Sequence, residues 1–376
     1  MPQPPVRYTS GVNTFPAKHS MRNYPVVPTQ FQITKGDDFI PFRQSTDYTA
    51  TTGGTGATAA AYPWNGGAVK ITCGSTTPYK SMEALGANSL IFVPGNQCWH
   101  DVRVAVPTTG TSNPANDATV YVGFFDNVDP SAATNGVYFV KPSGGSTVNF
   151  VILKAGTATT FSNIGDFSIP SGIYGDPLAS NGSLAFNTTG TTYTNVTVNN
   201  PGFGYRVAPL VIATGTAGSG AQLYCQLGSS AGNPNADGQG NGSSLYSPYI
   251  LAAGSGYTAN TLAADILPWI NLQFYYNGKG RLEVGINGKL LMSLDKDAPS
   301  TATPGQTYNL ASISLDSFNF SGTSLTTGVA PVQPAVGDPY VALPQVPLQL
   351  AFGLVGTTAN NRVMYVEEIN IGTELN

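Results

Sequence analysis

Apolar and polar residues alternate along much of the chain in short runs that end at Gly, Pro or Asn. The clearest run is FYYNGKGRLEVGINGKLLMSL, in which Leu282, Val284 and Ile286 alternate with polar residues or Gly. Because successive side chains of a strand point to opposite faces, these three residues predict a strand covered on one side. Asn-Gly pairs at 277–278 and 287–288 flank it, and Asn-Gly favours the positive φ angles of a type I′ hairpin turn. The pattern predicts two consecutive hairpins.

The same alternation predicts strands elsewhere along the chain. They are AVKITC (68–73), LIFV (90–93), VRVAV (102–106), VYVGFFD (120–126), GVYFVK (136–141), VNFVILK (148–154), LQLAFGLVG (348–356) and RVMYVEEINIG (362–372). In LQLAFGLVG all of Leu348, Leu350, Phe352 and Leu354 are in phase. Short strands separated by turn residues are typical of a β-sandwich or barrel, and the helix formers Lys, Glu and Leu are scarce.

The N-terminal segment, residues 1–36, differs from the rest because it is Pro-rich and aperiodic. It nevertheless carries Phe15, Tyr24 and Phe31, which a purely solvated tail would lack. We expect an extended arm that lies on another surface, with these three aromatic residues as its anchors.

The remaining chain divides into a discontinuous body and an insertion. Residues 37–175 and 267–376 contain the predicted strands of one large sandwich, whereas residues 176–266 are rich in Gly, Ser, Asn and Thr. Within the insertion Gly202-Phe203-Gly204-Tyr205 is answered by Gly254-Ser255-Gly256-Tyr257. This imperfect repeat of a turn followed by a strand predicts a small β-rich domain with its own topology.

Composition and charge agree with an all-β chain and exclude some partners. Only 10% of the 376 residues are charged, against about a quarter in ordinary soluble domains, and Gly (44) and Pro (28) are abundant. The net charge of −4, without basic clusters, argues against binding nucleic acid through its phosphates. No apolar run approaches the ~20 residues that a membrane helix needs, and the N-terminus lacks the apolar region of a secretory signal.

The three cysteines do not predict a disulfide framework. Cys73, Cys98 and Cys225 are odd in number and widely spaced. Cys73 is in phase with Val69 and Ile71, so we expect a buried free thiol there.

Two motifs could indicate catalysis, but their context argues against it. Residues 228–232 match G-x-S-x-G, yet the segment that follows, GNPNADGQGNGSS, cannot begin the helix of a nucleophile elbow. His100 precedes Asp101 in a predicted strand, so the two side chains point to opposite faces and Asp101 cannot orient the imidazole. We predict no enzymatic activity and no cofactor.

Two acidic segments could bind a cation, and both are better explained as turns. Residues 233–238 resemble the start of a calcium loop, but Ser244 occupies the position of the closing Glu. Asp126 and Asp129 in FFDNVDP fit the use of Asp in turns. We predict no metal site.

Three stretches together resemble a family of tailed-bacteriophage virion proteins. SGVNTFPAKHSMRNYPVVPTQF is similar to the family's leader and its Pro-containing entry to the body. VYVGFFDNVDPSAATNGVYFVKPSGGSTVNFVILKAGTATT is similar to the family's strand end, double hairpin and Thr-rich turn, with Asn135 where Asp is usual. LQFYYNGKGRLEVGINGKLL matches the family's "-gFyYdGkg-i-vyvNG--v". The three stretches cover about a third of the chain, in the family's order.

The resemblance implies a concanavalin-like (laminin-G-like) jelly-roll sandwich and a role in the phage particle. We expect a capsid decoration or minor capsid protein on the virion surface, made in the host cytoplasm. Its partners would be the major capsid protein and copies of itself, for example as a trimer, with the arm as the anchor.

An alternative is a tail or capsid fibre, or a receptor-binding protein of lectin type, that binds host surface glycans. Sandwiches of this kind often hold sugars in loops over one sheet, by stacking aromatic rings on sugar faces. Trp64, Trp99 and Trp269 are the stacking candidates, although a lone Trp more often lies in a core or an interface.

Overall fold

The computed structural model describes most of the body of the chain. The described residues are 6–7, 13–14, 32–37, 47–64, 67–77, 80–92, 95–107, 118–177, 179–189, 192–214, 219–228, 244–256, 263–295, 307–309, 317–319, 343–356 and 362–374.

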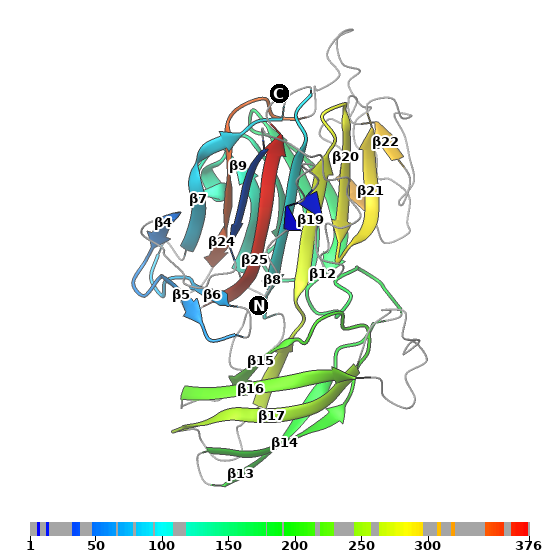
Figure 1. Ribbon diagram of the computed structural model, residues 1–376. Coiled ribbons are helices and arrows are strands. Elements are labelled where there is room, and N and C mark those ends of the chain that lie inside the picture. Colours follow the sequence, from blue (N-terminus) through cyan, green and yellow to red (C-terminus); the bar gives the residue numbers. More distant parts are fainter. Residues whose placement is uncertain are drawn as a thin grey trace.

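Two large sheets stack face to face, so the fold is the all-β, jelly-roll type of sandwich that the sequence predicted (Figure 1). The first sheet has eight strands, in the order β23 (Ser317–Asn319), β12 (Thr157–Asp166), β11 (Thr147–Lys154), β10 (Gly136–Lys141), β9 (Ala118–Phe125), β24 (Leu348–Gly356), β7 (Lys80–Leu90) and β4 (Tyr48–Gly53). A 3-10 turn, η3 (Pro130–Ala132), lies between β9 and β10.

The second sheet has nine strands. Its order is β22 (Thr307–Asn309), β21 (Lys289–Asp295), β20 (Arg281–Ile286), β19 (Ile270–Tyr276), β8 (Cys98–Ala105), β25 (Val363–Glu374), β6 (Ala68–Thr72) and β5 (Thr58–Tyr62), and β3 (Gln32–Asp37) also pairs with β25. Neighbouring strands in both sheets are antiparallel, except for the parallel pairs β12 with β23 and β21 with β22.

The inner faces of the two sheets enclose the main core. Leu282, Val284 and Ile286, predicted to share one face of a strand, are each 0% exposed within it. The ring of Phe274 on β19 lies stacked on His100 at 4.7 Å and contacts phenylalanine rings of the opposite, eight-stranded sheet, namely Phe124, Phe139 and Phe150. Burial of this one continuous apolar face is what holds the sheets together.

Most predicted strands are present, and three local predictions are wrong. LIFV (90–93) is largely outside a strand, which instead runs upstream as β7. Thr157–Thr160, expected in a turn, begins β12; the turn before it is made by Ala155 and Gly156, both with positive φ. Asn287 and Gly288 have the positive φ pair of a type I′ turn, but the first Asn-Gly pair does not. There the Asn277 side chain accepts hydrogen bonds from the next backbone N–H groups of a longer loop instead.

Six strands between β12 and β19 in the sequence, here called the inserted strands, pair with one another and surround a second core. They form the hairpin of β13 (Ser183–Thr189) and β14 (Thr192–Asn200), and the sheet β17 (Ser244–Ser255), β16 (Ser219–Gly228), β15 (Leu210–Thr214) and β18 (Ala263–Leu267). β14 lies beside β17 and β13 approaches β18. The glycines of the repeat share a backbone feature: φ is positive at Gly202, Gly204, Gly254 and Gly256. In Figure 1 these strands lie below the sandwich.

A third apolar cluster, here called the seam, joins the inserted strands to the outer face of the nine-stranded sheet. Leu210 and Leu267 at the ends of β15 and β18 pack with Trp269, Val363 and Tyr365 of the sandwich strands or their edges. The inserted strands are therefore packed against the sandwich as well as linked to it by the chain.

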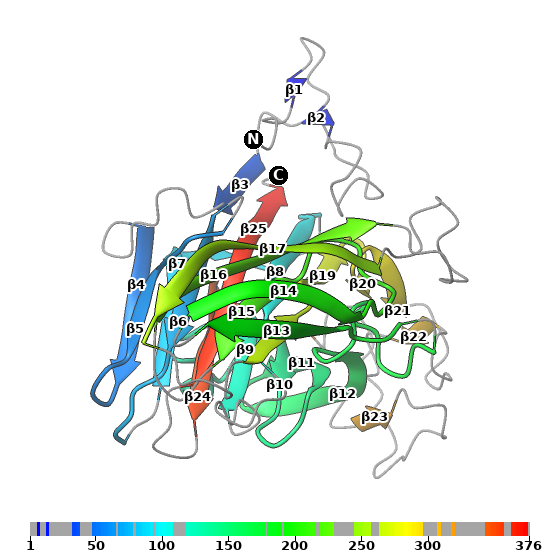
Figure 2. The same cartoon turned by 90° about the horizontal axis from the view of Figure 1, so that it is seen from below.

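The described part of the N-terminal segment makes only strands. β3 pairs with the second half of β25, from Asp37 opposite Ile369 to Gln32 opposite Glu374. β1 (Val6–Arg7) and β2 (Asn13–Thr14) pair with each other. Figure 2 shows β1 and β2 standing away from both sheets, beyond β3.

Candidate functional site

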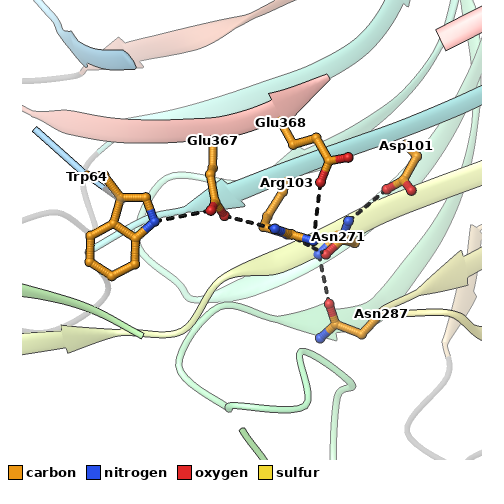
Figure 3. Close-up of polar contacts among 7 residues, drawn as sticks. All are labelled: Trp64, Asp101, Arg103, Asn271, Asn287, Glu367 and Glu368. Carbon is orange, nitrogen blue, oxygen red and sulfur yellow. Dashed lines mark hydrogen bonds and ion pairs between the residues drawn. The ribbon is translucent and has the colours of Figure 1, made fainter. Parts of the chain in front are cut away.

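The main polar cluster lies on the outer face of the nine-stranded sheet, where β25, β8 and β19 run side by side (Figure 3). Val102 and Val104 of β8 point into the core, so Arg103 between them points outward. Its register partners are Glu368 on β25 and Asn271 on β19. The cluster is thus a row of polar residues across three strands.

A β-bulge brings two consecutive acidic residues to the same guanidinium. The pairing of β25 with β8 shifts between Val366 and Glu368, which places an extra residue, Glu367, on the bulged strand. Without the bulge, neighbouring residues would point to opposite faces. Glu367 Oε2 lies 3.0 Å from Arg103 Nη1, and Glu368 Oε2 lies 3.2 Å from Nη2.

The hydrogen bonds of Arg103 and Glu367 extend the cluster in two directions. Arg103 Nε donates to Asn271 Oδ1 at 3.0 Å, and Asn271 Nδ2 donates to Asp101 at 2.9 Å. On the other side, Trp64 Nε1 donates to Glu367 Oε1 at 3.1 Å (Figure 3). The network therefore reaches from the centre of the sheet to the seam, where Trp64 packs.

Asn287, in the turn after β20, ties the cluster to neighbouring segments. Its side chain accepts from Asn271 N at 2.8 Å and donates to the Ser171 carbonyl at 2.7 Å. Its own carbonyl accepts from Arg206, between the hairpin β13–β14 and β15. A single turn thus connects the sheet, the segment after β12 that contains Ser171, and the segment that leads into β15.

Burial and charge act against each other in this network. Burial alone would lower the pKa of Arg103, but the charges of Glu367 and Glu368 outweigh it and raise that pKa. Burial raises the pKa of Glu367, and Arg103 opposes the shift only in part. The Arg103 and Glu367 side chains are 18% and 14% exposed. The charge of each group is thus stabilised by the opposite charge of its partner, and the loss of water around both groups offsets part of that stabilisation.

The arrangement suits bracing better than acid–base chemistry. Glycoside hydrolysis, for example, uses two carboxyl groups that face a substrate from separate positions roughly 5–9.5 Å apart. Here both carboxylates bind one guanidinium, and Glu367 also accepts from an indole. The network fixes three strands and the Trp64 ring relative to one another.

The aromatic residues singled out in the sequence have different environments. Phe15, Tyr24 and Phe31 lie outside the described residues. Trp64 is half-buried and packs 5.7 Å from Trp269, centroid to centroid.

The expectation that Trp99 and Trp269 offer rings to a sugar is wrong for this structure. Trp269 is 3% exposed because the seam encloses it. Trp99 is 8% exposed and packs against Gly372, where an added Cβ would approach Trp99 Cζ2 to 2.1 Å. Only Trp64 of the three keeps partial access to solvent.

His100 and Asp101 lie on opposite faces of β8, as alternation predicted. His100 is fully buried in the main core, and burial lowers its pKa to about 3. Its Nδ1 lies 3.0 Å from the Leu272 carbonyl, so the neutral ring donates that hydrogen bond. His100 is therefore a packed core residue.

The two acidic residues of FFDNVDP serve as turn residues. Burial would raise the pKa of Asp126, but hydrogen bonds from Asn135 and Thr134 outweigh it and lower that pKa. Asp129 caps η3 by accepting from Ser131 N, and pairs with Lys80 at 2.5 Å.

The three cysteines are free thiols in this structure. Cys73, Cys98 and Cys225 are buried and free, as predicted for Cys73. Within the described ranges, no group of three or more His, Cys, Asp or Glu side chains is arranged to hold a metal ion. The segment at 233–238 and most of the G-x-S-x-G match are not among them. None of the helices in this part of the chain is long and apolar enough to span a membrane.

Sequence reasoning missed Asp265, a carboxyl group at the seam. It sits on β18 between Ala264 and Ile266, on the side that faces Tyr365. Burial raises its pKa to about 6. In the sequence Asp265 alternates with apolar residues like any solvent-facing residue of a strand, so nothing there indicated that its carboxyl group would be partly buried.

We expect Asp265→Asn to stabilise the protein at pH 8 by about 1–2 kcal/mol, after allowing for solvent screening. The pKa of Asp265 is higher in the folded protein than in the unfolded chain, so the neutral carboxyl group is favoured by folding. This contribution to the free energy of unfolding is fully present below pH 3.8 and is lost as the pH rises through about 6. Chemical unfolding at pH 8 and pH 4 measures this. An equal gain at both pH values would contradict the assignment.

Comparisons with known proteins identify no family. No family model and no curated protein matches the chain. Several solved structures are similar over most of the chain at low identity, among them these three. A protein of unknown function from Shewanella oneidensis MR-1 shares 8% identity with a TM-score of 0.36, covering 99% of this chain and 97% of that one. An endo-1,3-beta-glucanase from Streptomyces sioyaensis shares 8% identity with a TM-score of 0.40, covering 94% and 100%.

The third is a carbohydrate esterase from the Shiga toxin-encoding bacteriophage phi24B, with 9% identity, a TM-score of 0.29 and coverage of 88% and 92%. Likeness at this level decides nothing about activity, so the functional argument has to come from the chain itself.

Proposed function

We propose that this chain is a non-enzymatic structural protein of a bacteriophage particle, of the capsid decoration or minor capsid type. The observation that carries the proposal is the N-terminal segment. Its last five residues, together with Asp37, are built into the sandwich as β3, while β1 and β2 pair only with each other within the described residues. The body thus holds the end of this segment as β3, while β1 and β2 stand away from both sheets (Figure 2).

The length of that segment suits a tether to a neighbouring molecule. Thirty-one residues precede β3. A fully extended chain spans at most ~3.3–3.6 Å per residue, so the segment can reach up to about 100 Å. Short strands and aromatic side chains on such an arm bind by adding to a partner's sheet edge and by filling apolar pockets.

The body has the properties of a rigid block. The Arg103 network braces its outer face, the seam fixes the inserted strands, and few charges need to be desolvated when surface is buried. The resemblance of three stretches to phage virion proteins agrees with this role. The partners would be the major capsid protein and further copies of this chain in a symmetric oligomer.

Deleting residues 1–31 tests the anchor. We expect the shortened protein, which keeps β3, to lose particle association and to retain its cooperative unfolding transition and β-type circular dichroism. Co-sedimentation with particles that lack the protein measures association. The control keeps residues 1–31 but scrambles their order, and we expect it to fail as well. Full binding by the deletion variant would overturn the arm as the anchor.

A further inference from the structure

The outer face of the inserted strands carries an aromatic surface made by β16 and β17. On β16 Leu223 and Cys225 point into the second core, so Gln222, Tyr224 and Gln226 point outward. Tyr249 of β17 lies directly opposite Tyr224 in the pairing register. The two tyrosines therefore form a cross-strand pair on the face away from the second core, where Tyr249 is exposed and Tyr224 is half-buried.

The pair belongs to a continuous row of rings that begins at the seam. Trp269 contacts Trp64 at 5.7 Å, Trp64 contacts Tyr224 at 5.9 Å, and Tyr224 contacts Tyr249 at 5.0 Å, all between ring centroids. Exposure rises along it, from 3% at Trp269 to 38% at Tyr249. The inner rings hold the outer ones in place, and the hydrogen bond to Glu367 fixes Trp64.

Two bulges in β17 leave further apolar side chains exposed. The pairing of β17 with β16 shifts where Tyr246 and Leu251 occur, and these extra residues are 66% and 62% exposed. Three of the four large apolar side chains that stand out as exposed among the described residues lie on this one strand.

The surface is neutral, and polar groups lie between the rings. β16 reads SGAQLYCQLG and β17 reads SLYSPYILAAGS, without a charged residue. Gln226 is opposite Ser247 in the register, next to the tyrosine pair. Amides, hydroxyls and flat rings thus alternate over a small area.

We infer that Tyr224 and Tyr249, with Trp64 beside them, form a binding platform for a neutral saccharide. A pyranose ring presents an apolar C–H face that packs on an aromatic ring and a rim of hydroxyls that pair with amide and hydroxyl groups. Tyrosine is a rigid ring with few rotatable bonds, so ordering it on binding costs little. The absence of charge from both strands favours an uncharged ligand over an anionic one.

A protein partner fits this surface less well. A stable protein interface buries about 800 Å² per partner, usually around an apolar centre. Here the tyrosine pair is flanked on both sides by polar residues, Gln222 on one side and Gln226 with Ser247 on the other. The platform is separate from the N-terminal arm and goes beyond the structural role proposed above.

The test uses the full-length chain and defined probes. Maltoheptaose, laminarihexaose, cellohexaose and tetra-N-acetylchitotetraose are titrated by calorimetry, with a sialylated lactose as the charged comparison. We expect one neutral oligosaccharide to bind and the charged one not to. Tyr249→Ala should weaken binding at least about 10-fold, Gln226→Ala a few-fold, and Tyr249→Phe little, because it keeps the ring.

Leu290→Ala is the matched control, since Leu290 is an exposed apolar residue, 51% exposed, on β21 of the sandwich. It should leave binding unchanged.

The Gln226→Ala variant keeps the test valid if Tyr249→Ala misfolds, because the Gln226 side chain is exposed. The inference would be overturned if none of the four neutral oligosaccharides bound, or if the wild type and Gln226→Ala bound equally well. Self-association that depends on Tyr249 in place of sugar binding would also overturn it. Particle association should survive Tyr249→Ala, which separates this platform from the arm.

Discussion

Replacing Arg103 by Met is expected to lower the free energy of unfolding by about 3–5 kcal/mol, because it leaves a buried carboxylate without its cation. The Glu367 side chain is 14% exposed, and without Arg103 it would keep the hydrogen bond from the Trp64 indole but lose the cation beside it. Urea unfolding followed by tryptophan fluorescence would report the loss, and Trp64 makes that probe sensitive to the site.

A second variant separates the charge effect from the loss of packing. Arg103→Met combined with Glu367→Gln removes the stranded charge while keeping the side-chain volume, so it should recover much of the stability. Arg103→Lys should fall in between, because an ammonium group cannot bind Glu367, Glu368 and Asn271 in the planar geometry of a guanidinium. If Arg103→Met had the same free energy of unfolding as the wild type, the Arg103 network would not stabilise the sheet.

Acid should destabilise the protein through His100, by as much as about 4–5 kcal/mol at pH 3. The pKa of His100 is lowered from 6.5 to about 3 by burial, so the unfolded chain binds a proton that the folded chain excludes. Stability is therefore fully present above pH 6.5 and falls by about 1.4 kcal/mol per pH unit as the pH drops toward 3.

The effect of His100 is opposed by Asp265 over part of this range. Asp265 has a raised pKa, so its contribution increases as the pH falls from about 6 to 3.8. We expect His100→Phe to flatten the loss of stability between pH 6.5 and pH 4, and Asp265→Asn to make it steeper. Phe can stack on Phe274 as His100 does. Identical pH slopes for His100→Phe and the wild type, from unfolding curves at one-unit intervals, would contradict this account.

The strands with strict alternation were predictable from the sequence, and β7 shows why others were not. Its inner face carries Ser81 and Glu83, both 0% exposed, together with Leu85. Period-2 analysis looks for apolar residues on the buried face, so these polar ones hid the strand. The apolar run at 90–93 was chosen in its place, although only Leu90 belongs to the strand.

The candidate site depends on features that leave no local signal. The bulge at Glu367 places two adjacent acidic residues beside Arg103, and nothing in VEEIN distinguishes it from a regular strand. Residue type alone directed attention to the tryptophans, whereas exposure selected Tyr249, and its ring contact then led to Tyr224. Exposure is set by how distant segments pack, so it becomes visible only in the folded chain.

The most direct test of the proposed role is the number of copies of this protein per particle, relative to the major shell protein, by quantitative mass spectrometry of purified virions. A decoration or minor capsid protein predicts a ratio near one or a simple lattice fraction of it. A handful of copies per particle, or none, would contradict that role, and a handful would point to a fibre.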